Sequence, residues 1–188
     1  MLKVISGGQT GVDRGALDAA LDLGLACGGW CPAGRLAEDG TIPERYPVSE
    51  LASAGYAERT AQNVADSDGT LIICSGEPIG GTRETVERCI GLQKPHFAID
   101  CERVPISEAV RLALDFMGNM SSQRLGTDAE EATLKLPQRG RAGQAVSLGT
   151  TVLNVAGPRA SQWPEGHAFT YQIMSAILRR MIGQKGAN

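Results

Sequence analysis

Aromatic side chains, histidine and positive charge are all scarce in this chain of 188 residues. Phe, Trp and Tyr make up 4% of the sequence, too few for a surface that stacks successive nucleobases. The formal net charge of −3 argues against a nucleic-acid partner held by bulk electrostatic attraction. This composition leaves room for a local positive pocket, so we expect a small anionic ligand and no nucleic acid.

Long apolar runs are also missing, and no stretch reaches the length of a membrane span. The first residues lack the apolar segment of a secretion signal. The five cysteines are odd in number and scattered, as is typical of small core residues in a reducing compartment. Cys27 and Cys31 are close in sequence, but with two histidines in the chain they do not indicate a zinc site. We therefore expect a cytoplasmic protein with no membrane partner and no protein-held metal.

The chain is organised around its opening stretch. Leu2–Ile5 is a short apolar run of strand type, Ser6–Gly11 is rich in glycine, and helical spacing begins at Asp13. A glycine loop between a strand and a helix N-terminus offers unpaired N–H groups and a positive dipole end to an oxyanion. Asp13 is a predicted N-cap. The predicted anion-binding residues are Gly7, Gly8, Gln9, Thr10 and Gly11, although the same pattern also suits a turn that only closes a strand onto a helix.

A second unit of the same kind follows. Asp68–Cys74 is an apolar run suited to a central parallel strand, and a glycine-containing loop and a helix come after it. Parallel strands bind ligands at their carboxyl ends, so both loops are expected at one edge of the sheet. Gly80, Gly81 and Thr82 are the candidate binding residues of this second loop.

The remaining elements also alternate between strand and helix. Further strands are predicted at Leu25–Cys31, His96–Asp100 and Thr151–Val155, and helices at Tyr56–Asp66, Pro105–Met117 and Phe169–Ile182. Residues 34–49 read as a long loop, and residues 118–149 as a mobile insertion with a short helix around 129–136. The fold class predicted is α/β: a single Rossmann-like, three-layer domain over 1–188, with a mainly parallel sheet flanked by helices.

Several stretches resemble the family of molybdenum (molybdenum-cofactor) carrier proteins. They are Ser6–Arg14, Gly28–Pro32, Gly34-Arg35, Glu38–Gly40, Tyr56 with Arg59-Thr60, Asn63-Val64, Ser67–Thr70, Gly80–Thr82 with Thr85, and Leu153–Arg159. The match covers residues 1–100 and 151–182 and leaves out 118–149. The family is a branch of a Rossmann-like group that includes the LONELY GUY phosphoribohydrolases and the DNA-processing protein of bacterial transformation. The resemblance implies a cytoplasmic oligomer that binds the molybdenum cofactor, a phosphate-bearing pterin with an oxo-metal centre.

Two classes of function compete. The first is a binding and carrier protein for an anionic, nucleotide-like cofactor, the molybdenum cofactor or a molybdate-like oxyanion. Arg14, Arg59 and Arg159 are its candidate charge partners. Asn63 joins them because it lies on the polar face that carries Arg59, although such a face is often merely solvated.

The second class is an enzyme that hydrolyses nucleoside monophosphates, as LONELY GUY proteins do. Their motif P-G-G-x-G-T-x-x-E ends in a catalytic Glu, and alignment on Gly81-Thr82 puts Thr85 at that position. Threonine cannot act as a carboxylate acid or base, and Glu84 is expected on another helix face. Binding is therefore favoured over hydrolysis, with Glu38 or Glu77 as possible substitutes for the missing carboxylate. A sensor of a nucleotide-derived signal would use the same pocket.

A homo-oligomer, dimer or tetramer, is expected from the closing helix. Its apolar residues spread over more than the single stripe needed to cover a sheet. Apolar surface left over in this way usually marks an interface, unless a thick core absorbs both faces.

Overall fold

The structure is a computed structural model that describes residues 1–123 and 151–183. A fully parallel sheet forms the centre of the protein. Its strands, in spatial order, are β2 (Cys27–Gly28), β1 (Leu2–Ile5), β9 (Thr151–Ala156), β7 (Gly69–Cys74) and β8 (His96–Asp100). Val4 pairs with Leu153, and Leu71 pairs with Val155, so the last strand lies between two earlier ones. Every residue of β7 is buried, as its apolar run predicts for a central strand.

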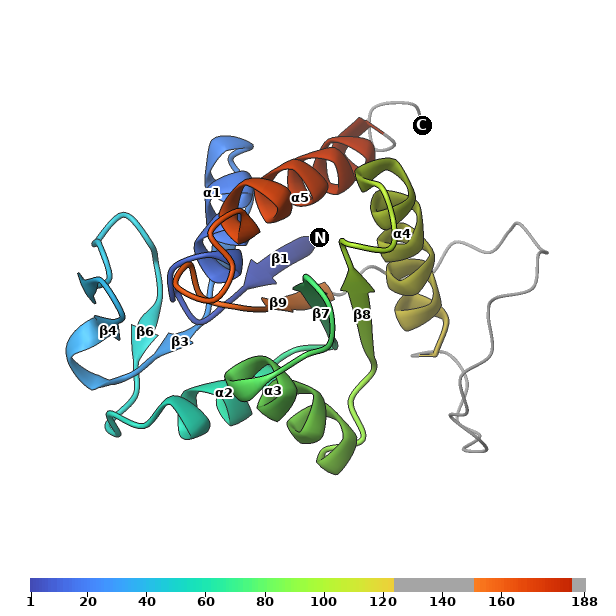
Figure 1. Cartoon of the computed structure of the whole chain (residues 1–188). Coiled ribbons are helices and arrows are strands. Elements are labelled where there is room, and N and C mark those ends of the chain that lie inside the picture. The colour runs from blue at the N-terminus through green and yellow to red at the C-terminus, as the bar shows by residue number, and fades with distance from the viewer. Residues whose placement is uncertain (124–150, 184–188) are drawn as a thin grey trace.

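Helices cover both faces of the sheet, which gives three layers (Figure 1). The helices α1 (Val12–Asp22), α4 (Ile106–Gln123) and α5 (Gly166–Gly183) lie on one face, and α2 (Tyr56–Ala65) and α3 (Gly80–Gly91) on the other. Gly15 lets α1 and α5 approach closely, because a Cβ atom there would lie 2.5 Å from the carbonyl oxygen of His167. The predicted α/β, Rossmann-like, three-layer class is confirmed.

The segment after α1 differs from the prediction. The strand expected over Leu25–Cys31 is broken into β2 and β3 (Trp30–Cys31), which belong to different sheets. Gly29 between them has φ = 127°, and a Cβ atom there would lie 2.1 Å from the carbonyl oxygen of Ser6. The chain bends at Gly29 because it crosses directly over the glycine loop.

Residues 34–49 are more ordered than a long loop. A 3-10 turn, η1 (Ala33–Arg35), leads into a hairpin of β4 (Leu36–Ala37) and β5 (Gly40–Thr41), and β6 (Ser49–Glu50) pairs with β3. The Arg35 guanidinium donates hydrogen bonds to the backbone carbonyls of four residues, Ile42, Pro43, Tyr46 and Val48, at 2.9–3.1 Å. The side chains of Ile42, Tyr46 and Val48 also form a small second core with Leu17 and Cys31.

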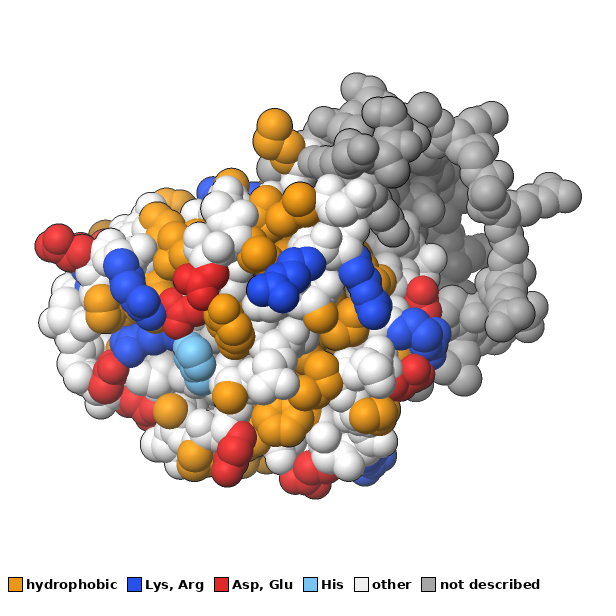
Figure 2. Space-filling model, turned by 90° about the horizontal axis from the view of Figure 1, so that it is seen from above, with side chains coloured by type: hydrophobic (Ala, Val, Ile, Leu, Met, Phe, Trp, Pro, Cys, Tyr) orange, Lys and Arg blue, Asp and Glu red, His pale blue; other side chains and the backbone are white. Residues whose placement is uncertain are grey.

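Helix α5 buries its broad apolar surface within the chain. Ile173, Met174, Ile177 and Leu178 are completely buried in the main core, between the sheet and the neighbouring helices α1 and α4. Most of the surplus apolar face expected on this helix is therefore buried in the core, although Ile182 near its end is 42% exposed. On the outer face formed by α1, α4 and α5, apolar side chains are interspersed with both signs of charge (Figure 2).

Helix boundaries account for the remaining differences. Helix α4 continues to Gln123, so residues 118–123 are helical and do not belong to an aperiodic insertion. The rest of the predicted insertion, with its short helix around 129–136, lies outside the described residues, and the single-domain organisation stays a prediction. Within the residues described, no helix is long and apolar enough to cross a membrane.

Candidate functional site

The glycine loop after β1 places a carboxylate at the start of α1. Gly11 is the N-cap, so the prediction that Asp13 caps the helix is wrong. Asp13 lies in the first turn, is 4% exposed, and its Oδ2 atom accepts the Gln9 backbone N–H at 3.2 Å. Arg59 Nη1 forms an ion pair with the same oxygen at 3.1 Å. Burial raises the pKa of the Asp13 carboxyl above its ordinary value, and the nearby Arg59 charge opposes this shift.

Two amides expected to hold an anion already have partners within the loop. The Gln9 N–H donates to Asp13, and the Thr10 N–H donates to Oε1 of Gln9 at 3.0 Å. Gly7 makes room for Arg59, since a Cβ atom there would lie 1.5 Å from Nη1 of the guanidinium. Gly7 therefore accommodates an internal ion pair, and with the Gln9 and Thr10 amides engaged, a ligand here would need side-chain donors as well.

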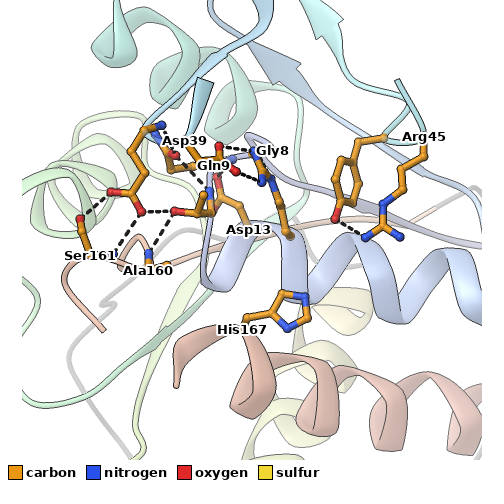
Figure 3. A network of polar contacts seen from close by, with 12 residues as sticks. Gly8, Gln9, Asp13, Asp39, Arg45, Ala160, Ser161 and His167 are labelled. Carbon is orange, nitrogen blue, oxygen red and sulfur yellow. Dashed lines mark hydrogen bonds and ion pairs between the residues drawn. The ribbon is translucent and has the colours of Figure 1, made fainter. Parts of the chain in front are cut away.

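Gln9 presents one such donor. Its Oε1 atom accepts N–H groups from Thr10 and Glu38, at 3.0 and 2.9 Å, which fixes the orientation of the side-chain amide. The Nε2 atom is therefore left buried without a hydrogen-bond partner, as is Nε of Arg59. Buried donors are nearly always paired in native proteins, so two orphan donors on residues that line one pocket point to an acceptor that binds there. Figure 3 shows Gln9 and Asp13 beside Ala160 and Ser161 of the loop after β9.

The two orphan donors line a pocket at the carboxyl ends of the parallel strands. About 510 Å³ of space, mouth included, lies between the first glycine loop, α2, the start of α3 and the loop after β9. Its lining comprises Gln9, Asp13, Tyr56, Arg59, Thr60, Gly81, Thr82, Glu84, Thr85, Ala156, Gly157, Arg159 and Gln162. Six predicted site residues from four separate stretches of the sequence thus line one pocket: Gln9, Asp13, Arg59, Gly81, Thr82 and Arg159.

Cationic and aromatic groups surround the mouth of the pocket. The guanidinium carbons of Arg59 and Arg159 lie 6.0 and 5.9 Å from the ring centroid of Tyr56. Thr82 and Thr85 are buried at the start of α3, whose N-cap Ile79 provides no side-chain cap. The open N-terminus of this helix adds a positive dipole end to the two arginines.

The start of α3 bears on the hydrolase alternative. Glu84 and Thr85 both line the pocket, and they differ in burial, as the predicted rotation between consecutive helix residues implies. The Thr85 hydroxyl donates to the carbonyl of Gly81 at 3.0 Å, whereas Glu84 is a third exposed and pairs with Arg88 at 3.4 Å. The pocket is wide enough at this end to reach two consecutive residues of the helix.

The other predicted site residues hold the surrounding loops together. Arg14 donates to the carbonyl of Gly8 at 3.1 Å and binds Asp39 through both terminal nitrogens, at 2.5 and 2.8 Å. Asn63 bonds the backbone N–H and carbonyl of Trp30, both at 2.9 Å. Gly80 has φ = 52° at the first position of α3.

Thr10 and the loop after β9 make contacts that were not predicted from the sequence. The Thr10 hydroxyl donates to Glu38 and accepts the Ala160 N–H at 3.1 Å. Gln162, Thr60 and Gly157 also line the pocket. The loop after β9 could have been predicted as part of the pocket, because a glycine turn follows the last strand at Ala156-Gly157-Pro158-Arg159.

The fold defines a Rossmann-like α/β protein, and its pocket lies where the two glycine loops meet the loop after β9. More specifically, the chain belongs to the Circularly permutated YpsA SLOG family, whose model matches residues 4–127. It is similar to the crystal structure of a "Putative molybdenum carrier protein" from Syntrophus aciditrophicus SB, with a TM-score of 0.77 and 37% identity, covering 94% of each chain. The resemblance to molybdenum carrier proteins is thereby confirmed. No protein of curated function matches the sequence.

Proposed function

We propose that this protein binds and carries an oxyanion-bearing cofactor, the molybdenum cofactor, in the pocket between the two glycine loops. The observation that carries the proposal is the pair of buried, unpartnered donors, Nε2 of Gln9 and Nε of Arg59. Both are donors only, so the missing partner is an acceptor such as a phosphate or metal-oxo oxygen.

The surroundings of the orphan donors suit an anion. Arg159 and the uncapped N-terminus of α3 add positive potential, and Thr82 of that helix adds a hydroxyl group. Asp13 neutralises part of the Arg59 charge, so the site favours a ligand with neutral donors and acceptors as well as charge. The Syntrophus protein, which is named a molybdenum carrier, shares 37% identity with this chain, and this supports a cargo that contains molybdenum.

The anion site can be tested with Gln9→Glu, using molybdate and phosphate as probes in calorimetric titrations. Glutamate keeps an oxygen for the Thr10 and Glu38 amides but replaces the orphan donor with a negative acceptor. We expect affinity to fall at least about tenfold, because a hydrogen bond to a charged group contributes about 1.5–3 kcal/mol.

Gln172→Glu is the matched control, since Gln172 lies on α5 away from this pocket and the change adds the same charge. This control should bind as the wild type does. Equal affinity in Gln9→Glu and wild type, with both folded, would overturn the site. Native mass spectrometry with metal analysis of protein purified without added ligand then tests the cargo: a pterin-sized adduct containing molybdenum is expected.

A nucleotide hydrolase is the second candidate, favoured by the position of Glu84 in the pocket wall. A carboxylate there could assist water attack on the glycosidic carbon of a nucleoside monophosphate. Base release from AMP that disappears in Glu84→Gln would establish this function. We expect no release of base, because Glu84 is paired with Arg88 and because Thr85 takes the position of the catalytic glutamate in the LONELY GUY motif.

A further inference from the structure

The Glu38 carboxylate is held in place by donors from two other segments of the chain. It accepts hydrogen bonds from the Thr10 hydroxyl, from the Ser161 N–H at 3.1 Å and from the Ser161 hydroxyl at 2.5 Å. Nε of Arg159 lies 3.9 Å from one of its oxygens. Two hydroxyls, a backbone N–H and a guanidinium thus converge on the carboxylate.

Such a set of donors is also the set that binds a free oxyanion. Carboxylate and phosphate oxygens accept the same charge-assisted bonds from hydroxyl, amide and guanidinium groups. Partial burial raises the pKa of Glu38, but the bonds from Ser161 and Thr10 and the Arg159 charge outweigh this effect, and the net pKa is lowered. Glu38 is therefore ionised at neutral pH and occupies its place as an anion.

This carboxylate lies next to the ligand pocket. Arg159 lines the pocket and also faces Glu38. The Gln9 side-chain oxygen accepts the Glu38 N–H, and Gln9, whose Nε2 atom is unpaired, lines the same pocket. Ser161, at the edge of the network in Figure 3, lies in sequence between Arg159 and Gln162, both of which line the pocket. A ligand with two anionic groups could therefore reach both the orphan donors and the donors around Glu38.

The Glu38 side chain can rotate away from these donors without a change in the core. It stands at the tip of the β4–β5 hairpin, whose strands are two residues each and whose Asp39, Gly40 and Thr41 are exposed. Its side chain is 18% exposed, so rotation toward solvent needs no movement of the core. Gln9 and the Arg14–Asp39 ion pair keep the hairpin backbone in place when the side chain rotates.

We propose that Glu38 occupies a second oxyanion subsite of the pocket, and that a ligand carrying two anionic groups binds by displacing this carboxylate. The inference rests on the proposed function, because the first anionic group must bind at Gln9 and Arg59. It adds a substrate class: two-headed anions such as diphosphates, or a phosphate ester bearing a second oxyanion. A ligand with one anionic group leaves Glu38 undisturbed.

The test is Glu38→Ala, titrated calorimetrically with orthophosphate and with pyrophosphate. Removing the competing carboxylate should tighten pyrophosphate binding about tenfold or more and change orthophosphate binding less than threefold. Glu44→Ala is the matched control: it removes an exposed carboxylate elsewhere in the same segment and should leave the ratio of the two affinities unchanged. Glu38→Gln removes the charge but keeps the shape, and should shift the ratio in the same direction by a smaller factor.

The outcomes separate the two proposals. If orthophosphate binds to the wild type and Glu38→Ala and Glu38→Gln leave the pyrophosphate-to-orthophosphate ratio unchanged, Glu38 is a structural clamp and this inference fails alone. If neither anion binds to the wild type or to any variant, the pocket does not bind oxyanions and the proposed function fails as well.

Discussion

Asp13 and Arg59 form a charged pair inside the protein, where each charge depends on the other. Removing ions from water costs several kcal/mol each, and the pair offsets this only through its geometry and further hydrogen bonds. Here the Gln9 N–H supports the carboxylate, whereas Nε of the guanidinium has no partner. The pair is therefore incompletely satisfied, which is the condition expected of a group that meets a ligand.

The raised pKa of Asp13 makes folding stability depend on pH. Since the folded-state pKa exceeds the ordinary value, the native state binds more protons between the two values, and stability falls as pH rises through that window. Asp13→Asn should lack this fall when urea unfolding is measured across acidic and neutral pH.

Asp39 should contribute a pH dependence of stability with the opposite sign, and Asp39→Asn should remove that contribution. Bonding from Arg14 lowers the pKa of Asp39, so its contribution is present above the ordinary pKa and lost as pH falls. Asp39 is half exposed, and its effect on the free energy of unfolding is correspondingly small.

For Asp13, profiles of unfolding free energy against pH that run parallel in the wild type and in Asp13→Asn would contradict the assignment.

Arg35 is predicted to stabilise the segment that carries the Glu38 hairpin. Its planar guanidinium reaches four backbone carbonyls at once, and a lysine can satisfy only part of this set. Arg35→Lys should lower the free energy of unfolding by roughly 2–4 kcal/mol, given about 1.5–3 kcal/mol for a hydrogen bond to a charged group. Arg45→Lys, at a mostly exposed guanidinium, serves as the control and should change stability by less than about 1 kcal/mol.

At the scale of elements, Gly11 joins the glycine loop to α1 and to the loop after β9. It has φ = 75°, and a Cβ atom there would lie 2.6 Å from the carbonyl oxygen of Pro158. Gly24 also has a positive φ, 65°, but has no heavy atom within 4 Å of the same position. Gly24→Ala should cost about 1–2 kcal/mol from backbone strain alone.

Gly11→Ala should cost clearly more than Gly24→Ala in thermal or urea unfolding, because backbone atoms must also move. The same change should weaken anion binding, since it displaces the start of α1 from the wall formed by the loop after β9. Equal losses of stability in the two variants would mean that Gly11 is needed only for its dihedral angles.

The elements best predicted from sequence are those whose pattern is local. The apolar run of β7 and the periodicity of α2 appear within one or two residues of their predicted limits. The break at Gly29 was missed because its cause is a contact with Ser6, far away in sequence. For the same reason, the sequence indicated both glycine loops but not the Glu38 contacts, which join residues 28 and 123 positions apart.

At the scale of the whole molecule, a homo-oligomer stays our prediction, but helix α3 is the better candidate for the contact. Ile79 and Ile90 are each 62% exposed, with the Arg83–Glu87 ion pair between them on the same helix. Two antiparallel copies of this stripe around a twofold axis would bring Ile79 against Ile90, and Arg83 against Glu87, of the second copy.

Ile90→Glu should therefore shift the protein toward monomer in sedimentation at micromolar concentration. Ile182→Glu, at a 42% exposed position on α5, adds the same charge elsewhere and should leave the assembly intact. A wild-type species near 19.8 kDa would refute the oligomer itself.

The position of β9 also sets the order in which the sheet can form. Leu153 pairs with Val4 of β1, and Val155 pairs with Leu71 of β7, so β1 and β7 lie on either side of a strand that is synthesised after both of them. Until Thr151–Ala156 is synthesised, both strands keep unpaired edges that can recruit other chains. The sheet therefore closes only after Thr151–Ala156 is synthesised, and a nascent chain stalled before residue 151 exposes the two strand edges that β9 covers.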